Sequence, residues 1–302
     1  MAQNGRSASR ARRITTLHVV RTEWLTPTVV RVVAGGPGFA DFVTNEFTDK
    51  YVKLLFLAPG VEYPNPLDVA EVQATMPREH WPIKRTYTVR YVDPAAREIA
   101  IDFVTHGDTG IAAPWAARAE PGDEIRFFGP AGAYAPNPKA DWHLLAGDEA
   151  ALPAIASALE SMDDGVPAHV ILDVAGPAEQ QPLTTKADAA ITWLYRDGST
   201  PTHLNDAATP FTGTQTPSDD GVSRLVAAVK AMPWRPGRAQ VFIHGEAGLV
   251  KGLRPYLLDD RGVARGDLSL SGYWRAGMVE DDFQAWKKTE RESGRETVIY
   301  PS

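Results

Sequence analysis

The sequence predicts two domains: a small antiparallel β-barrel of about six strands, followed by an α/β domain with a parallel sheet. A chain of 302 residues is long enough for two domains with separate cores. From residue 14 to 136, short runs rich in Val, Ile, Thr and aromatic residues are punctuated by Gly, Pro and Asp, as in small barrels. From residue 137 to 302, strand-like and helix-like segments alternate, which is typical of a parallel sheet covered on both faces.

Composition narrows the class of function. Hydrophobic residues make up 43% and charged residues 23%, which is ordinary for a soluble globular protein. The 31 basic and 38 acidic residues give a net charge of -7, so we expect neither nucleic acid nor a membrane surface as a partner. The absence of cysteine excludes disulfides, thiolate nucleophiles, iron–sulfur clusters and cysteine zinc sites, and we expect a cytoplasmic protein.

The first segments along the chain predict a tail and then the barrel. Residues 1–13 are basic and polar without an apolar signal segment, so we expect a flexible tail. Residues 61–84 contain several prolines, and we expect a surface loop there. The predicted barrel strands lie within residues 15–25, 28–36, 51–59, 85–93, 98–106 and 124–132.

A proline-containing linker, Ala133–Asp141, separates the two predicted domains. Beyond it, residues 200–221 form a polar loop without an assigned role. Strands are predicted within residues 142–147, 169–176, 191–197, 240–248 and 267–277, and helices within residues 150–162, 222–232, 248–260 and 280–293.

The segment RTYTVR, residues 85–90, places a guanidinium and a phenol on one face of a strand. Because side chains alternate along a strand, Arg85, Tyr87 and Val89 share a face, and Thr86 and Thr88 point the other way. A guanidinium suits a phosphate, a phenol ring can lie against a flat ring, and a threonine can hydrogen-bond its polar edge. A barrel that precedes a nucleotide-type sheet suggests a flavin clamped between two domains, although this motif alone is also compatible with a solvated strand.

Residues 102–132 contain a second candidate binding segment. Gly107 and Gly110 allow a tight turn before a short predicted helix, Ala112–Ala119, whose first amides could hold a pyrophosphate. His106 could reach the adenosine or a phosphate. The alternative for this segment is a capped turn with His106 on the surface.

In the second domain, candidate residues follow the predicted strands. LLAGDEAALPAI carries Asp148 and Glu149 at a strand–helix junction, but it lacks G-x-G-x-x-G, and Asp148 could serve only as a helix cap. HGEAG places Gly245 and Gly248 at a strand end, where a nicotinamide could come close. SGYWRAG places Tyr273, Trp274 and Arg275 after the last strand, where aromatic residues are either core or a cover for a flat cofactor.

Taken in order, the motifs resemble one known family over nearly the whole chain. RTYTVR, DFVTHGDTG, LLAGDEAALPAI, HGEAG, SGYWRAG and EDDF are similar to the siderophore-interacting proteins, a family of FAD-dependent ferric-siderophore reductases related to ferredoxin–NADP reductases. The resemblance implies a Greek-key barrel that binds FAD non-covalently and a C-terminal NAD(P)-binding domain. It implies that NADH or NADPH reduces the flavin, which reduces a ferric siderophore and releases Fe(II).

The resemblance also implies roles for individual residues. Arg85, Tyr87 and Thr88 would form the FAD-binding trio, and a basic pocket beside the flavin would dock an anionic siderophore. The residues expected to bind the cofactors, partly through their backbone, are Arg85, Tyr87, Thr88, Asp102, Phe103, Val104, His106, Ala112, Ala113, Trp115, Asp148, Glu149, Gly245, Glu246, Tyr273 and Trp274. The residues expected to bind the siderophore are Lys53, Lys251, Arg254 and Arg275.

Two departures from the family pattern affect single residues. The chain reads GIAA where relatives commonly read Gly-Pro-Ala-Ser, so Ala113 lacks a hydroxyl, and it reads GDEA where relatives often read GDET, so Ala150 lacks another. Arg196 is a candidate for the 2′-phosphate of NADPH, but the sequence leaves NADH, NADPH and reduced ferredoxin open as donors.

Other functions stay open at this point. A flavin reductase acting on quinone or free flavin would share the FAD-binding residues, and a siderophore-binding protein without electron transfer would lack FAD. A hydrolase is disfavoured because there is neither a G-x-S-x-G motif nor a cysteine. We expect a monomer without a bound metal of its own.

Overall fold

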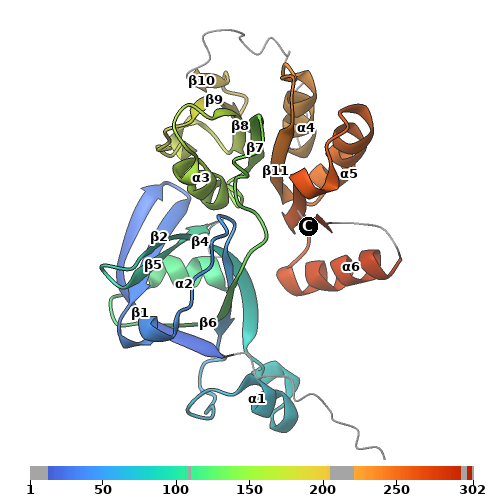
Figure 1. Ribbon diagram of the computed structural model, residues 1–302. Helices are drawn as coiled ribbons and strands as arrows, with labels where there is room; N and C mark the ends of the chain where they lie inside the picture. Colours follow the sequence, from blue (N-terminus) through green and yellow to red (C-terminus); the bar gives the residue numbers. More distant parts are fainter. Residues whose placement is uncertain (1–12, 106, 108–109, 205–220, 294–297, 301–302) are drawn as a thin grey trace, which may run out of the picture.

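The computed structural model describes residues 13–105, 107, 110–204, 221–293 and 298–300. The β-barrel lies below the α/β domain in Figure 1, and the helix near the C-terminus lies beside their junction. Both predicted architectures are confirmed, and within the described residues they form a closed six-stranded barrel and a seven-stranded sheet. No helix in the described part of the chain is both long and apolar enough to cross a membrane.

The barrel is antiparallel and follows a Greek-key order, β1-β2-β5-β4-β3-β6. Alternate residues point inward, so that Val52 and Leu54, for example, are buried in the barrel core. Its strands are β1 (Ile14–Thr26), β2 (Val29–Gly35), β3 (Tyr51–Phe56), β4 (Ile83–Asp93), β5 (Glu98–Val104) and β6 (Glu124–Ala131).

A short helix, α2 (Ala112–Arg118), packs against β2 and β5. Its small residues Ala112 and Ala116 are buried in the barrel core cluster, which allows the helix to lie close to the strands. The segment predicted to form this helix therefore does so, and its first turn directly follows the glycine-rich turn at Gly110.

The insert at residues 61–84 contains helical structure that the loop prediction missed. Helix α1 (Val69–Thr75) begins after Asp68, whose Oδ1 accepts hydrogen bonds from the amides of Ala70 (2.8 Å) and Glu71 (3.2 Å). A single turn, η2 (Arg78–His80), follows it, and another, η1 (Pro37–Asp41), follows β2. The Asp68 cap and the apolar spacing after it were the sequence signals for α1.

The second domain contains a mixed sheet in the order β10-β9-β8-β7-β11-β12-β13. The five central strands, β9, β8, β7, β11 and β12, are parallel to one another. The edge strands β10 and β13 pair antiparallel with their neighbours. The strands are β7 (Trp142–Asp148), β8 (Pro167–Val174), β9 (Asp188–Tyr195), β10 (Thr202–Leu204), β11 (Ala239–Glu246), β12 (Leu268–Trp274) and β13 (Val298–Ile299). The helices are α3 (Leu152–Ser161), α4 (Gly221–Ala231), α5 (Gly248–Pro255) and α6 (Glu280–Glu292), with short turns η3 (Pro177–Glu179), η4 (Tyr256–Asp260) and η5 (Arg265–Asp267).

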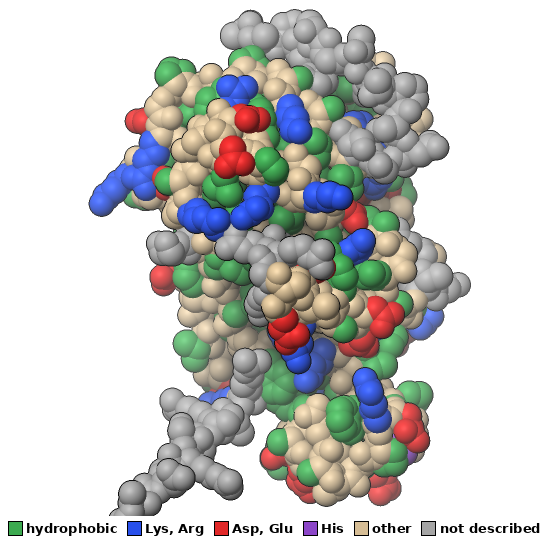
Figure 2. Space-filling view, turned by 90° about the vertical axis from the view of Figure 1, so that its right-hand side faces the viewer, with side chains coloured by type: hydrophobic (Ala, Val, Ile, Leu, Met, Phe, Trp, Pro, Cys, Tyr) green, Lys and Arg blue, Asp and Glu red, His purple; other side chains and the backbone are tan. Residues whose placement is uncertain are grey.

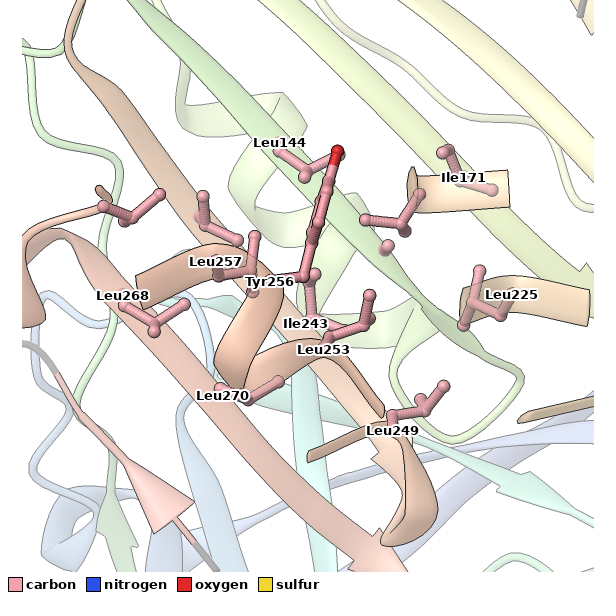
Figure 3. Close-up of a cluster of buried hydrophobic side chains, with 14 of the residues drawn as sticks. Leu144, Ile171, Leu225, Ile243, Leu249, Leu253, Tyr256, Leu257, Leu268 and Leu270 are labelled. Carbon is pink, nitrogen blue, oxygen red and sulfur yellow. The ribbon is translucent and has the colours of Figure 1, made fainter. Parts of the chain in front are cut away.

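Helices bury the apolar residues of this sheet. One cluster contains residues of α4 and α5 together with Leu144, Ile243 and Leu270 from the strands, and Figure 3 shows these side chains converging. A second cluster contains the residues of α3. Gly147 is required where β7 meets α3, because a Cβ there would lie 2.5 Å from both the Ala151 Cβ and the His244 carbonyl oxygen.

The chain begins to pack against the second domain slightly before the predicted boundary at residues 136 and 137. Tyr134 is fully buried in the cluster that contains α3. The Gln240 amide donates to the Ala135 carbonyl (3.1 Å) and accepts from the Asn137 amide (2.7 Å). The segment between the domains is therefore fixed to β11 by hydrogen bonds.

We predict that His143 makes the stability of the protein depend on pH. This histidine is buried on β7, and burial lowers its pKa from about 6.5 to about 4, although Gln240, which can accept a hydrogen bond from the protonated ring, opposes the shift. Because the unfolded chain binds the proton more tightly, the stabilising contribution is present above pH 6.5 and is lost as the pH falls towards 4, by on the order of 3 kcal/mol.

The His143→Gln variant should flatten this loss when the free energy of unfolding is measured by urea denaturation between pH 7 and pH 4. The exposed His18→Gln variant is the control and should retain the parent slope. Superimposable slopes for the parent and His143→Gln would contradict the assignment.

Candidate functional site

Strand β4 places the Arg85 and Tyr87 side chains on the barrel side of the strand, as the alternation predicted. Tyr87 lies opposite Val52 and Arg85 lies opposite Leu54 in the β3–β4 ladder. The Tyr87 ring packs on the Phe103 ring with centroids 4.4 Å apart. Burial raises the pKa of the Tyr87 phenol well above its ordinary value, with a further contribution from the charge of Glu280. The phenol therefore stays protonated.

Strand β4 changes its pairing partner along its length. Residues Val89–Asp93 of β4 pair with β5, and the register ends at Val89 opposite Ile101. The preceding half of β4 pairs with β3 instead. Beyond the pair of Val89 and Ile101, the Tyr87 ring of β4 packs on the Phe103 ring of β5. The backbone of β5 beyond Ile101 therefore continues past the end of its ladder with β4.

The opposite side of β4 faces the second domain. The Arg90 guanidinium makes two hydrogen bonds to the Glu160 carboxylate on α3, at 2.9 and 2.5 Å. Thr88 is buried, and its side chain lies near that of Tyr273, close to the end of β12. Thr86 donates to Glu280 on α6 at 3.2 Å. This face of β4 therefore forms a large part of the domain interface.

The Arg85 guanidinium lies at the edge of this interface. It donates to the Lys84 carbonyl (2.7 Å) and lies 3.6 Å from the Asp281 carboxylate in the first turn of α6. The Arg85 side chain is 17% exposed, whereas that of Asp281 is 72% exposed, so the ion pair is open to water. An anion could replace Asp281 as the partner of Arg85 without the burial of an unpaired charge.

A pocket of about 620 Å³ opens beside α2. It is lined by the end of β3, the start of β6 and the beginning of α2, including Gly110, Ile111 and Trp115. No side chain caps the first turn of α2 among the described residues, so the amides of that turn have no side-chain acceptor there. Leu54 lines the pocket and lies opposite Arg85 in the β3–β4 ladder, although Arg85 itself does not line the pocket.

Some predicted flavin contacts have other partners in the structure. The Asp102 carboxylate is buried and accepts two hydrogen bonds from Arg31, at 2.6 and 2.8 Å, so its side chain is part of the barrel wall. Phe103 is a fully buried core residue, and Trp115 packs against it with ring centroids 5.8 Å apart. Val104 pairs with Val29 in the sheet. His106 lies outside the described residues.

Asp148 connects three strand ends of the second domain. Its carboxylate accepts hydrogen bonds from the Trp274 indole (2.8 Å), the Glu246 amide (2.9 Å) and the Ala150 amide (2.9 Å). Burial raises its pKa to about 7, and the neighbouring Glu149 adds to the shift. Asp148 does not cap α3, whose N-cap residue is Ala151 without a side-chain cap; its bond to Ala150 lies in the turn before the helix, and it also holds the indole of Trp274 in place.

Gly245 and Glu246 complete this group of strand ends. Strand β7 lies between β8 and β11, and its chain connection leads to β8, so the direction of winding reverses between β7 and β11. Ligands of such sheets bind beyond the carboxyl ends of the strands at this point. The Glu246 carboxylate accepts from the amides of Gly248 and, at 3.3 Å, Ala276.

Tyr273 joins the end of the sheet to the barrel. Burial raises the pKa of its hydroxyl well above the ordinary value, and the nearby Thr88 side chain opposes this shift. Its ring meets the ring of His244 edge-on at 4.7 Å, and His244 in turn stacks on Phe242 and bonds Ser269 (2.8 Å). Burial lowers the pKa of His244 well below 6.5, so this histidine is a neutral packing residue.

Glu149 and Arg196 belong to a second polar group at the ends of β7, β8 and β9. Arg196 donates to Glu149 and, at 2.9 Å, to Asp173, and Arg224 donates to Asp173 at 2.7 Å. Sequence reasoning identified Glu149 and Arg196 separately but missed Asp173 and Arg224. The signal for Asp173 was its place at the end of a predicted strand.

The predicted siderophore-binding cations lie on three elements. Lys53 lies in β3, opposite Thr86 of β4. Lys251 is exposed on the first turn of α5, and Arg254 lies one turn further along the same helix. Arg275 follows β12. The Arg275 guanidinium lies over the Trp286 ring of α6 at 4.3 Å. Figure 2 shows the face that carries α5 and α6, where Lys and Arg side chains gather over the upper domain. Whether the four cations act together stays a prediction.

The domain contacts made by Arg90 and Glu179 were missed by the sequence analysis. Besides the Arg90–Glu160 pair, Glu179 of η3 is buried and accepts from the hydroxyls of Thr26 (2.5 Å) and Thr28 (2.7 Å) of the barrel. Alternation predicted that Arg90 points away from the barrel core, but nothing in the sequence identified its partner.

We predict that Gly245→Ala destabilises the protein more than Gly60→Ala does. Both glycines have a positive φ, 144° and 74°, so both variants carry the backbone strain of about 1–2 kcal/mol. At Gly245 the new Cβ would also lie 2.5 Å from the Asp148 carboxylate, whereas no atom lies within 4 Å at Gly60. Displacement of that carboxylate should cost a further 1–3 kcal/mol, roughly, as its hydrogen bonds weaken.

The free energy of unfolding from urea denaturation, measured for both variants at pH 7, tests this comparison. Equal losses for the two variants would show that the Asp148 carboxylate can move at no cost.

Both halves of the chain match family models of known proteins. The model of the siderophore-interacting FAD-binding domain matches residues 18–134, and the model of the siderophore-interacting protein matches residues 140–277. An uncharacterized protein of Mycobacterium tuberculosis is 46% identical over 283 residues, which is 91% of this chain and 96% of that relative. The ferric vibriobactin reductase of Vibrio cholerae is 28% identical and covers 88% of this chain and 91% of its own length.

A solved structure supports the same assignment. The crystal structure of a siderophore utilization protein from T. fusca superimposes with a TM-score of 0.69 at 34% identity, over 88% of this chain and 94% of that chain. With both halves matched, the chain belongs to the siderophore-interacting protein family, and its barrel is the FAD-binding domain of that family.

Proposed function

We propose that this protein is a flavin-dependent reductase of ferric siderophores that takes its electrons from NADH or NADPH. The observation that supports this function is the packing of β4 against the second domain, through Thr86–Glu280 and Arg90–Glu160 and with Thr88 near Tyr273. It places the barrel motif Arg85-x-Tyr87-Thr88 next to the strand ends of β11 and β12 in the second domain. A flavin at this junction would be reachable from a dinucleotide bound to the sheet.

The residues present fit FAD. The pyrophosphate needs donors, and Arg85 together with the uncapped amides of Ala112 and Ala113 supplies them. The flat ring system needs an aromatic surface and a hydroxyl, which Tyr87 and Thr88 supply. The pocket of about 620 Å³ beside α2 offers room for the adenosine end, next to the Trp115 ring.

The reaction balances for one nicotinamide and two metal ions. NADH or NADPH loses a hydride, two ferric siderophores gain one electron each, and one proton is released. Bound FAD supplies the chemistry that links a two-electron donor to a one-electron acceptor. Because hard oxygen ligands hold Fe(II) less tightly than Fe(III), reduction releases the metal from its chelator.

The side chains of this chain bind and orient the reactants in this scheme. Trp274, held by Asp148, is 43% exposed at the end of β12 and can cover the nicotinamide. Gly245 leaves the carboxyl end of β11 without a side chain, so that the nicotinamide can approach the backbone. No proton transfer by a protein group is required, because the hydride and the electrons carry the reaction.

An anionic siderophore would be attracted by local positive charge, since the chain as a whole has a net charge of -7. Lys53, Lys251, Arg254 and Arg275 are the candidates. Lys251 lies on the first turn of α5, directly after β11, and therefore at the same edge of the sheet as Gly245. This placement favours Lys251 over cations that lie at the amino ends of the strands.

An anaerobic stopped-flow experiment tests the function. The FAD-loaded protein is mixed with NADH or NADPH while the flavin absorbance is followed, and the reduced protein is then mixed with a ferric catecholate siderophore and an Fe(II) chelator. We expect bleaching, reoxidation and one Fe(II) per electron. Reoxidation by quinone or free flavin but by no ferric siderophore would indicate the alternative reductase, and a protein unable to bind FAD would indicate a non-redox siderophore-binding protein.

We predict that Arg85→Gln weakens FAD binding. Loss of a charge-assisted hydrogen bond to the pyrophosphate should cost about 1.5–3 kcal/mol, or roughly 10- to 100-fold in the dissociation constant. Titration of the apoprotein with FAD, followed by flavin fluorescence, measures it. The control is Arg21→Gln, which removes an arginine paired with Glu98 on the barrel surface. An unchanged dissociation constant for Arg85→Gln would exclude the guanidinium from the pyrophosphate site.

We predict that Lys251→Glu raises the KM for an anionic ferric siderophore several-fold and leaves the rate of flavin reduction unchanged. The reason is repulsion between the new carboxylate and the chelate, which should weaken as salt is added. Lys186→Glu is the control, because Lys186 is an exposed lysine just before β9, at the opposite edge of the sheet. Equal KM values for the two variants would remove Lys251 from the docking site.

A further inference from the structure

Four charged side chains form a row of ion pairs, Glu149–Arg196–Asp173–Arg224, at the carboxyl ends of β7, β8 and β9. Glu149 directly follows β7, Asp173 is the second-last residue of β8, and Arg196 directly follows β9. The fourth member, Arg224, comes from the first turn of α4. Their charges sum to zero, and the side chains of Glu149 and Asp173 are only 8% and 2% exposed.

Both arginines are already engaged with these carboxylates. One terminal nitrogen of Arg196 donates to the Asp173 carbonyl (3.1 Å) and carboxylate (2.9 Å), and the other donates to Glu149. Arg224 donates to the second oxygen of Asp173 at 2.7 Å. Withdrawal of Arg196 to bind an external anion would leave two buried carboxylates without this partner, which is strongly unfavourable.

One oxygen of the Glu149 carboxylate can still accept a hydrogen bond. Among the described residues, the hydrogen bonds recorded for its carboxylate come from Arg196 and from the Ala175 amide (2.8 Å), and both fall on Oε1. The second oxygen, Oε2, is thus available to a hydroxyl donor. A carboxylate at the end of an early strand of such a sheet is the group that accepts a hydrogen bond from a ribose hydroxyl.

The network lies where the adenosine half of a dinucleotide would lie. The nicotinamide has to approach the barrel, and the barrel contact is made by Tyr273 at the end of β12, on the β11 side of β7. A dinucleotide that crosses the strand ends at β7 therefore extends in the other direction, over β8 and β9. With about 4.8 Å between neighbouring strands, the end of β9 is roughly 10 Å from the end of β7.

We propose that Glu149 makes NADH the preferred donor over NADPH. Glu149 accepts a hydrogen bond from the adenosine ribose through Oε2, and the pairing of both arginines with Glu149 and Asp173 leaves no free positive charge there to hold a 2′-phosphate. Arg196 balances these carboxylates and so does not serve as a phosphate site. This inference rests on the proposed function only in that the protein binds a nicotinamide dinucleotide.

Binding and reduction are measured separately on the FAD-loaded protein. Calorimetry compares 5′-ADP with 2′,5′-ADP, which differ only by the 2′-phosphate, and anaerobic bleaching of the flavin compares NADH with NADPH. We expect the parent to favour 5′-ADP and NADH by at least about 10-fold, and Glu149→Gln to reduce or reverse this preference, because Arg196 loses its Glu149 partner and can pair with the 2′-phosphate.

The matched control is Asp188→Asn. It removes the same charge from the opposite end of β9 and should retain the parent preference. Circular dichroism and the flavin spectrum establish that the variants are folded. A parent that binds 2′,5′-ADP as tightly as 5′-ADP, that binds neither probe, or whose preference is unaltered by Glu149→Gln would overturn the inference. Failure to reduce ferric siderophores with this preference intact would instead refute the proposed function alone.

Discussion

Strand β4 packs in the barrel core with one face and contacts the second domain with the other, and the candidate site depends on both sets of contacts. Its inward residues Tyr87 and Val89 pack in the barrel core, while its outward residues Thr88 and Arg90 contact β12 and α3 of the second domain. Because successive side chains of a strand point in opposite directions, one strand can contribute to the barrel core and to the domain interface. The motif that suits a flavin therefore lies at the interface.

Although the chain is acidic overall, its charged side chains act through specific contacts with individual partners. Buried carboxylates at the strand ends of the second domain have specific partners: Asp148 bonds an indole and two amides, and Asp173 bonds two arginines. In contrast, the Arg85–Asp281 pair is exposed and long. The physical difference matters for binding, since an exposed pair can exchange partners at little cost, whereas buried pairs retain theirs.

Long, strongly patterned segments were predictable because their periodicity is local. Both the barrel strands and the alternating elements of the second domain lie where period-two and helical spacing placed them, and Arg85 and Tyr87 share the expected face. Short elements were missed: β10 and β13 have three and two residues, too few to show a period, and exist because a sheet edge pairs with them. The predicted loop at residues 61–84 concealed α1, whose signal was the Asp68 cap.

By itself, the sequence determined the two architectures, their order, and the motifs that resemble the siderophore-interacting proteins. Only the tertiary structure decided which charged groups are available for binding. Asp102 is occupied by Arg31, which is 71 residues away, and Glu149 is paired with Arg196, which is 47 residues away. Such partners are brought together by the packing of whole strands and helices, whereas periodicity and motifs describe only neighbours along the chain.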